Sequence, residues 1–249
     1  MKKIEIIPIL MPIIENNDDI ANILLNHFSA KENFLQTGDI LIIAHTIISR
    51  AEGKEKYLPS VNFSPIAEFM ARKTGKDPSL VELIIRESEK LMKIKNGLII
   101  SKTKHGWICA NAAIDQSNAK PGHAVLLPDD SSKSAKRIGE IIEKEMGINI
   151  SILVSDTHGR ALRRGAINVA IGSYNFAVID DAKGRKDLFG YPLKSTIIAL
   201  ADEICCAAEL LMGQANEGIP VVLIRGFVQR SNVSSIEELQ YSDEQRLFN

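Results

Sequence analysis

Three short polar segments carry the residues that could do chemistry, and each of them follows an apolar run. They are residues 111–118, which contain Asp115, residues 155–160, which contain Asp156, and residues 213–220, which contain Gln214. Hard cations such as Mg²⁺ and Mn²⁺ prefer carboxylate, hydroxyl and amide oxygens, and leave positions open for phosphate and water. The segments supply these donors and no thiol. We therefore predict that they form a metal-nucleotide site.

Asp156 is the strongest candidate among them. Residues 150–154 are typical of a buried strand, so the carboxylate is expected just beyond the end of that strand. Thr157 adds a hydroxyl there, and Gly159 permits a sharp turn. The carboxyl ends of strands often border ligand sites. An Asx turn or a helix N-cap would use the same residues, and that alternative stays open.

The other two segments have structural alternatives as well. Asp115 follows an apolar strand-like run and precedes an amide and hydroxyl series, Gln116 to Asn118, which a simple turn would also explain. Residues 213–220 could be only a helix stop and a connection. Their amide and carboxylate side chains, Gln214, Asn216 and Glu217, would equally suit a phosphate or metal loop.

Basic residues and one histidine add weaker candidates. Arginine forks suit carboxylate and phosphate, but a solvated face with exposed ion pairs explains such a cluster too. His45 ends an apolar run and is either a ligand contact or a partly buried histidine. The basic cluster consists of Arg160, Arg163, Arg164, Lys183, Arg185 and Lys186, interspersed with Asp180, Asp181 and Asp187.

Hydrophobic periodicity predicts the elements that position these residues. Strands are expected over 4–9, 39–48, 98–103, 107–113, 149–155, 166–172 and 220–227, and helices over 18–28, 64–74, 78–92, 132–146 and 194–212. Asp77 and Pro78 are typical of a helix start, and Gly147 and Gly213 of helix ends. The strands at 98–113 are expected to pair through a turn at Gly106.

This pattern predicts a mixed α/β (α+β) fold. It is neither a Rossmann nor a P-loop fold, because no G-x-G-x-x-G or G-x-x-x-x-G-K-[ST] motif occurs and neighbouring strands lack a crossover helix. We expect one domain over residues 1–249, with room for two subdomains.

Composition excludes several classes of protein. The 249 residues carry a formal charge of -1, with 45% hydrophobic and 24% charged residues, which argues against a general nucleic-acid or anionic-membrane binder. Cys109, Cys205 and Cys206 form no zinc or disulfide spacing, so a reducing cytoplasm is expected. The longest apolar helix contains three acidic residues and predicts no membrane span.

Several motifs, in order along nearly the whole chain, resemble the coenzyme F-420:L-glutamate ligase family, the γ-glutamyl ligases of deazaflavin cofactor synthesis. They occur at residues 49–53 (SRAEG), 111–118 (NAAIDQSN), 155–160 (SDTHGR), 163–165 (RRG), 184–190 (GRKDLFG), 201–203 (ADE) and 212–220 (MGQANEGIP).

The resemblance implies a family-specific fold and a GTP-dependent amide ligase. It implies two divalent cations, Mn²⁺ or Mg²⁺, with K⁺ as a further cation to test, and a homodimer. We expect no appended reductase domain, because the sequence ends soon after Phe227. In such a reaction the γ-phosphate of GTP activates an acceptor carboxylate as an acyl phosphate, and the amino group of L-glutamate attacks it. All three substrates are anionic, so cations must offset their repulsion.

The resemblance also implies roles for single residues. Asp115 and Asp156 would hold one cation, and Thr157 and Gln214 the second. The GTP site would be lined by Met11, Pro12, Ile13, Ile14, His45, Thr46, Arg50 and Asn118, and wrapped by Gln214, Ala215, Asn216, Glu217 and Gly218. Arg160, with Asp115 and Asp156, is our candidate for a catalytic role, and Arg164 for a carboxylate or phosphate contact.

The chain departs from the family pattern at four positions, and three alternatives to the implied function stay open. The chain differs from the expected family pattern at His45, Arg50, His158 and Gln214, and Gln214 is neutral where we expect an acidic ligand. The acceptor could be F-420-0 or a folate such as a tetrahydrofolate monoglutamate. The protein could instead bind nucleotide and metal without ligase activity, or hydrolyse a phosphate.

Overall fold

A five-stranded mixed sheet forms the centre of the computed structural model, which describes residues 3–29 and 34–246. In spatial order it contains β1 (Glu5–Ile9), β12 (Val221–Arg225), β2 (Ile40–Ala44), β8 (Ser151–Gly159) and β9 (Ala166–Tyr174). The pair β2 and β8 is parallel, and the other neighbouring pairs are antiparallel. The mixed α/β fold class is thus confirmed, and the sheet is not the parallel sheet of a Rossmann fold.

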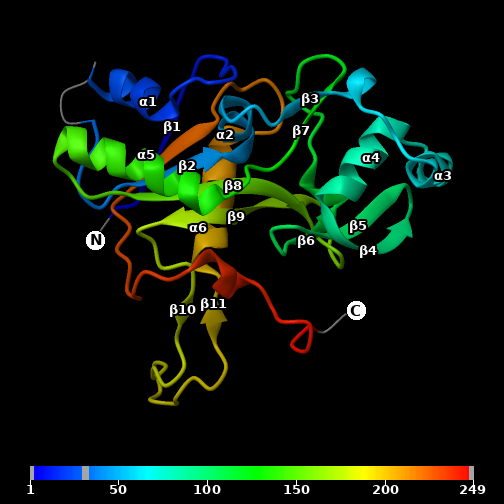
Figure 1. The fold of residues 1–249 in the computed structure, drawn as a ribbon. Coiled ribbons are helices and arrows are strands. Elements are labelled where there is room, and N and C mark those ends of the chain that lie inside the picture. The colour runs from blue at the N-terminus through cyan, green and yellow to red at the C-terminus, as the bar shows by residue number, and fades with distance from the viewer. Residues whose placement is uncertain (1–2, 30–33, 247–249) are drawn as a thin grey trace.

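Both faces of this sheet are covered, which explains why β2 is apolar at every position (Figure 1). Leu41 and Ile43 face α1 (Ile20–Ser29) and α5 (Ser131–Met146) in one buried cluster. Ile40 and Ile42 face α6 (Leu200–Met212) in a second cluster. The alternation of side chains along a strand sends successive residues into the two layers.

A smaller unit lies beside the central sheet, on the right of Figure 1. It contains α3 (Pro65–Thr74), α4 (Pro78–Glu87), the sheet β4 (Ser88–Lys95), β5 (Leu98–Thr103) and β6 (Ile108–Ala110), and the ribbon β3 (Glu55–Tyr57) with β7 (His123–Val125). It has a separate apolar cluster around Val81, Ile84 and Ile99. The predicted turn at Gly106 joins β5 and β6, which pair as expected.

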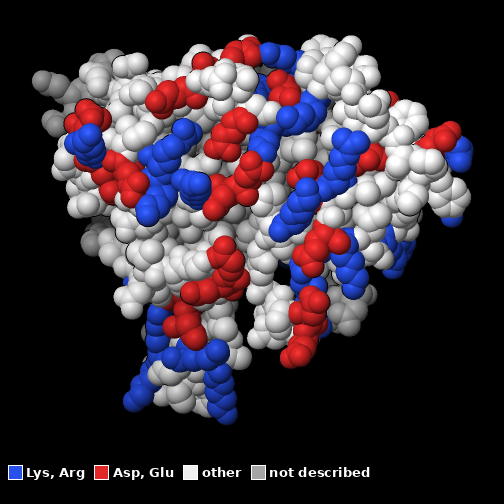
Figure 2. All heavy atoms as spheres, in the orientation of Figure 1, with Lys and Arg blue, Asp and Glu red and all other residues white. Residues whose placement is uncertain are grey.

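An arm leaves the body through β10 (Asp180–Asp181) and β11 (Ile197–Ile198), at the bottom of Figure 1. Leu188 and Phe189 on this arm are almost fully exposed. Figure 2 shows that Lys and Arg side chains gather around the end of the arm. The three-residue or four-residue 3₁₀ turns are Leu58–Ser60, Asn111–Ala113 and Ile236–Leu239.

Some predicted boundaries are wrong. The strand expected over 39–48 ends at Ala44, and α2 (His45–Ala51) follows directly. A short apolar run fits a buried helix as well as a strand, so periodicity could not separate them. The helix expected over 78–92 ends at Glu87, because residues 88–95 gain backbone hydrogen bonds by pairing with β5. The helix expected from residue 194 begins at Leu200.

The predicted helix ends are confirmed at three positions. The Asp77 carboxylate accepts hydrogen bonds from the backbone N–H groups of Ser79 and Leu80 at the start of α4. Gly147 ends α5 with a φ of 68°, and Gly213 ends α6 with a φ of 66°. In the part of the chain that the structure describes, no helix is long and apolar enough to cross a bilayer.

Candidate functional site

Sheet topology brings the predicted segments to one edge. Strands β2 and β8 are parallel, so their carboxyl ends meet there. Strand β12 is antiparallel to β2 and begins at this edge, while β1 is antiparallel to β12 and ends at it. The loop at residues 115–120 arrives from the smaller unit. Together they enclose a cavity of about 630 Å³, which we call the polar cavity.

Sixteen residues with a role implied by the resemblance line the polar cavity. They are Met11, Pro12, Ile13, Ile14, His45, Thr46, Arg50, Asp115, Asn118, Asp156, Thr157, Gln214, Ala215, Asn216, Glu217 and Gly218. They come from five separate parts of the chain, so their convergence depends on the fold and not on proximity in sequence.

Asp156 lies at the centre of this edge, although not where the sequence placed it. Strand β8 continues to Gly159, so Asp156 is inside the strand rather than beyond it. Pairing with β2 nevertheless stops at Ser155, which leaves the next carboxylate at the open edge. His45 Nε2 lies 3.2 Å from Asp156 Oδ1, and the N–H of Thr157 donates to the same oxygen at 2.7 Å.

His45 is a buried histidine, as one of the two interpretations expected, and its contact with a ligand stays a prediction. The side chain is buried, and its Nδ1 lies 3.3 Å from the Ser49 hydroxyl. The opposite nitrogen holds Asp156. A histidine held at both nitrogens has a fixed ring orientation, and so it positions the carboxylate next to it.

Asp115 occupies a turn and also lines the cavity. Its backbone pairs with Val125, and its carboxylate accepts from the Ser117 N–H and hydroxyl, each at 2.7 Å. The turn before it, Asn111–Ala113, has φ values of 54°, 53° and 56°. The left-handed conformation costs roughly 1–2 kcal/mol for each non-glycine residue. Strain of this kind is often found at functional sites.

Two positive side chains, Arg50 and Lys120, also line the polar cavity. Arg50 donates from Nη2 to the carbonyl of Asn118, and its Nε lies 3.6 Å from a carboxylate oxygen of Glu55. Within the described residues, this buried Nε–H has no hydrogen-bond partner. Lys120 forms an ion pair with Glu15 at the rim. A guanidinium with an unused donor suits an anionic ligand.

The sequence did not single out Glu209, which lines the cavity on the last turn of α6. Its carboxylate accepts from Gln214 Nε2, which also donates to the Thr157 hydroxyl at 2.9 Å. Burial raises the pKa of Glu209, against the lowering effect of the Gln214 hydrogen bond. Gly213 makes this contact possible, because its positive φ turns residue 214 back toward the helix.

The donor set determines which cation the site could hold. Among the described residues, no three His, Cys, Asp or Glu side chains converge as a metal cluster. The two expected cations would therefore need neutral oxygens, from the hydroxyl of Thr157 and the amide of Gln214, besides the carboxylates of Asp115 and Asp156. These oxygen donors fit Mg²⁺ or Mn²⁺ and do not fit the nitrogen and sulfur preference of Zn²⁺. The metal assignment stays a prediction.

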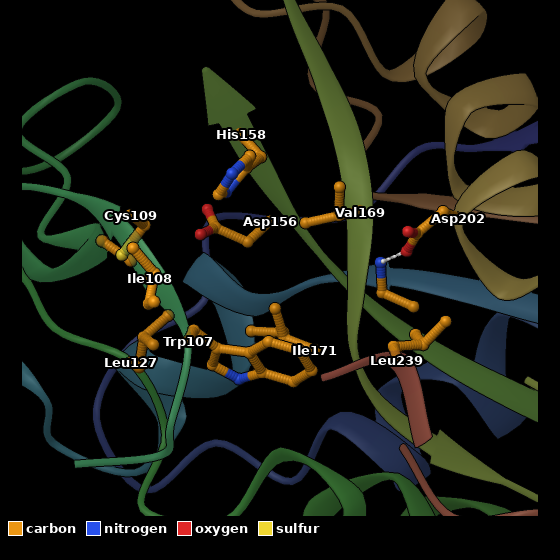
Figure 3. A pocket seen from close by; sticks show the side chains of 12 residues that line it. Trp107, Ile108, Cys109, Leu127, Asp156, His158, Val169, Ile171, Asp202 and Leu239 are labelled. Atoms are coloured by element: carbon orange, nitrogen blue, oxygen red, sulfur yellow. Dashed lines mark hydrogen bonds between the residues drawn. The ribbon is translucent and has the colours of Figure 1, made fainter. Parts of the chain in front are cut away.

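A second cavity of about 230 Å³, the apolar cavity, shares Asp156 with the first. Figure 3 shows the Asp156 carboxylate on the side of Cys109 and His158, with Trp107 and Ile171 below them in the view. None of the described residues that line it is a lysine or arginine. Burial, and secondly the Asp156 charge, raises the pKa of Cys109 to about 12. These walls do not favour phosphate or a free carboxylate.

Comparison with known proteins identifies the family. The family model described as F420-0:Gamma-glutamyl ligase matches residues 8–226. The chain belongs to this family. Three relatives named coenzyme F420:L-glutamate ligase agree with this assignment. The protein of Methanothermobacter thermautotrophicus is 44% identical over 87% of this chain and 86% of its own length. The protein of Methanopyrus kandleri is 42% identical over 84% of this chain and 81% of its own length. The protein of Methanocaldococcus jannaschii is 41% identical over 90% of this chain and 88% of its own length.

Membership of the F-420-0:γ-glutamyl ligase family confirms the resemblance and, with it, the expected class of enzyme, a ligase that forms amide bonds. The homodimer and the cytoplasmic location remain predictions. So do GTP, the divalent cations and K⁺.

Two arginines with a predicted role, Arg160 and Arg164, are not among the described residues that line the polar cavity. Arg160 instead bonds to its own loop. Its Nε donates to the Gly165 carbonyl at 3.1 Å, and its Nη2 donates to the Arg164 carbonyl at 2.7 Å. The guanidinium thus closes the loop between β8 and β9. In the structure Arg160 therefore bonds to backbone carbonyls of its own loop, and its catalytic role stays a prediction.

Proposed function

We propose that the protein joins the amino group of L-glutamate to a carboxylate of F-420-0, with GTP as the activating nucleotide. The observation that carries the proposal is the convergence of sixteen expected residues on the polar cavity, in a chain of this ligase family. The cavity volume of about 630 Å³ lies within the range of roughly 300–1,000 Å³ that small-molecule sites occupy.

The reaction has two balanced steps. An acceptor carboxylate oxygen attacks the γ-phosphorus, the bond to the β-phosphate oxygen breaks, and GDP leaves with an acyl phosphate formed. The glutamate nitrogen then attacks the acyl carbon, the carbon–oxygen bond to phosphate breaks, and the nitrogen loses a proton. Because every reactant is anionic, positioning and charge compensation supply most of the rate enhancement.

The chain contributes defined groups to this reaction. The Arg50 guanidinium would offset the charge of a phosphate group, because it lines the cavity with Glu55 as its nearby carboxylate. Residues 213–218 would close over the nucleotide, since they leave α6 at Gly213 and line the cavity. His45 would keep the carboxylate of Asp156 turned toward the reacting phosphate.

Two divalent cations are part of the proposal. Asp115 and Asp156 would hold one, and Thr157 and Gln214 would hold the other, all of them oxygen donors on the walls of the polar cavity. When bound, such cations neutralise the phosphate charge and act as Lewis acids. We also propose that K⁺ supports the reaction, which omission of K⁺ from the assay tests. We further propose a homodimer, which a measurement of the protein's mass in solution tests.

Mass spectrometry of the products tests the function. The protein is incubated with GTP, Mn²⁺ and L-glutamate, and in parallel with F-420-0 or a tetrahydrofolate monoglutamate; a third arm replaces GTP by ATP. We expect a glutamyl mass increment on F-420-0, with GDP formed in equal amount. Omission of glutamate, acceptor or Mn²⁺ should each abolish the increment.

Each other outcome has a defined meaning. An increment on the folate alone would retain the chemistry and replace the acceptor. Phosphate release without glutamate or acceptor would indicate a phosphohydrolase and contradict the proposal. GTP that binds and stays intact in every arm would indicate a binding protein without ligase activity.

A further inference from the structure

Glu209 lies in a hydrogen-bond network that connects α6 to the polar cavity. Gln214 Nε2 contacts the Glu209 carboxylate and the Thr157 hydroxyl. The Thr157 hydroxyl donates to Asn168 Oδ1 at 3.1 Å, and the side chain of Asn168 is also hydrogen-bonded to Glu209. One carboxylate therefore contacts two amide side chains, Gln214 and Asn168.

An ionised carboxylate accepts hydrogen bonds and donates none. The Gln214 group in contact with Glu209 must therefore be the amide NH₂, which leaves Gln214 Oε1 as the atom not used in this contact. An isolated amide could turn over and exchange its oxygen and nitrogen, since the two ends have nearly the same shape. Glu209 removes that freedom.

Asn168 fixes the direction of the Thr157 hydroxyl. Asn168 is buried, and its Nδ2 lies 3.9 Å from Met212 Sδ on the side where Asn168 also interacts with Glu209. Its Oδ1 is the end that accepts from the Thr157 hydroxyl. Thr157 then uses its only hydrogen toward Asn168. A lone pair of Thr157 Oγ1 is left for another partner, in addition to the one that accepts from Gln214.

We propose that Glu209 is a positioning residue that turns the oxygens of Gln214 and Thr157 toward the second divalent cation. This inference rests on the proposed function, since it concerns the cation that the proposed reaction uses. The cation's direct ligands are neutral, and Glu209 supplies a negative charge behind them without contacting it. Partners of this kind behind metal ligands commonly alter metal affinity by roughly 10- to 100-fold.

Mn²⁺ binding, measured by electron paramagnetic resonance of the free ion in the presence of GDP, tests the proposal without requiring turnover. In Glu209→Gln the new amide can donate to residue 214, so Gln214 is free to turn over and present its NH₂ to the cation. We expect the dissociation constant of the weaker Mn²⁺ site to rise at least about 10-fold.

The double variant Glu209→Gln, Gln214→Glu exchanges the two side chains. A carboxylate at position 214 accepts from the amide at 209 with one oxygen and presents the other to the cation. We expect the Mn²⁺ affinity of this double variant to lie within about threefold of the original affinity or to exceed it. If Glu209 had only a structural role, the exchange would not restore Mn²⁺ binding. Glu203→Gln, an exposed change on the same helix, is the matched control and should leave Mn²⁺ binding unaltered.

Unchanged Mn²⁺ binding in folded Glu209→Gln would overturn the proposal. Weakened binding that the exchange does not restore would also overturn it, because Glu209 would then act only through its charge. If Glu209→Gln is unstable, Glu209→Asp keeps the charge but is one methylene too short to hold Gln214, and the same weakening is expected. The expected Mn²⁺ results in a protein that ligates no glutamate would leave this inference standing and contradict only the proposed function.

Discussion

The two cavities that meet at Asp156 differ in how they are built. The polar cavity is formed by loops and element ends at one edge of the central sheet, and it contains carboxylates, amides, hydroxyls and Arg50. The apolar cavity is formed largely by strands and their packing, with Trp107, Val169 and Ile171 among its walls. Loops and element ends thus supply most of the polar groups of the site, while strands supply most of the walls of the apolar cavity.

The comparison also shows why one carboxylate can belong to both environments. Asp156 is the first residue of β8 beyond the pairing with β2, so its side chain lies at the boundary between sheet and open edge. His45 and the backbone of Thr157 hold it there. Changes in the polar cavity should therefore affect substrate binding and turnover, and changes in the apolar cavity should affect mainly stability.

The largest effect is expected at the shared residue. Asp156→Asn keeps the shape of the side chain and removes the charge that the polar cavity needs, so glutamate-dependent GDP release should fall at least about 10³-fold. The melting temperature should change by only a few degrees, because Asp156 contributes charge rather than packing. Near-normal ligation at the same Mn²⁺ and GTP concentrations would contradict the metal assignment.

A smaller effect, on the affinity for GTP, is expected at Arg50. Arg50→Ala removes a charged donor from the polar cavity, and the loss of a charge-assisted contact of about 1.5–3 kcal/mol corresponds to a rise of roughly 10- to 100-fold in the dissociation constant for GTP. Calorimetric titration with GTP measures this dissociation constant. Arg72→Ala, an exposed change on α3, is the matched control. Equal affinities in both variants would remove Arg50 from the nucleotide site.

The apolar cavity should respond in stability instead. Trp107 contacts both large buried clusters and is partly buried, so Trp107→Ala should lower the free energy of unfolding by about 2 kcal/mol, below the roughly 3–5 kcal/mol for a fully buried aromatic residue. GTP affinity should stay within about twofold. Phe189→Ala on the exposed arm should change stability by less than about 0.5 kcal/mol. A large loss of GTP affinity in Trp107→Ala would erase the distinction between the cavities.

The smallest effect concerns the Cys109 thiol. Because burial raises its pKa to about 12, the thiol is almost fully protonated near pH 8 and should resist iodoacetamide until the protein is unfolded in urea. The pKa is higher in the folded than in the unfolded state, so this group favours folding below about pH 9 and that contribution is lost as the pH rises toward 12. Rapid labelling of Cys109 in the native protein would show that the cavity is open to solvent.

Those site residues that are polar and directly follow an apolar segment could be predicted from the sequence. Asp115, Asp156 and Gln214 each follow a buried element, and the fold brings all three to one cavity. Glu209 could not be found in this way, because a single acidic residue in an amphipathic helix is ordinary. Only the turn at Gly213 folds residue 214 back onto it.

The apolar cavity and several boundaries were beyond sequence reasoning for a different reason. Trp107, Val169 and Leu239 are far apart in the chain, and nothing local indicates that they share a cavity. The extension of β8 through Asp156 depends on pairing with β9. The change from helix to strand at Ser88 likewise depends on pairing with β5. Such tertiary contacts override local propensity.

Transfer of oxygen-18 tests the central claim, that the polar cavity activates an acceptor carboxylate with GTP. The acceptor F-420-0 is labelled in both carboxylate oxygens and incubated with GTP, Mn²⁺ and L-glutamate, and the released phosphate is analysed by mass spectrometry. The account predicts one labelled oxygen in each phosphate and one in each new amide. Unlabelled phosphate, formed while the glutamyl product accumulates, would contradict the acyl phosphate and the activating role given to this cavity.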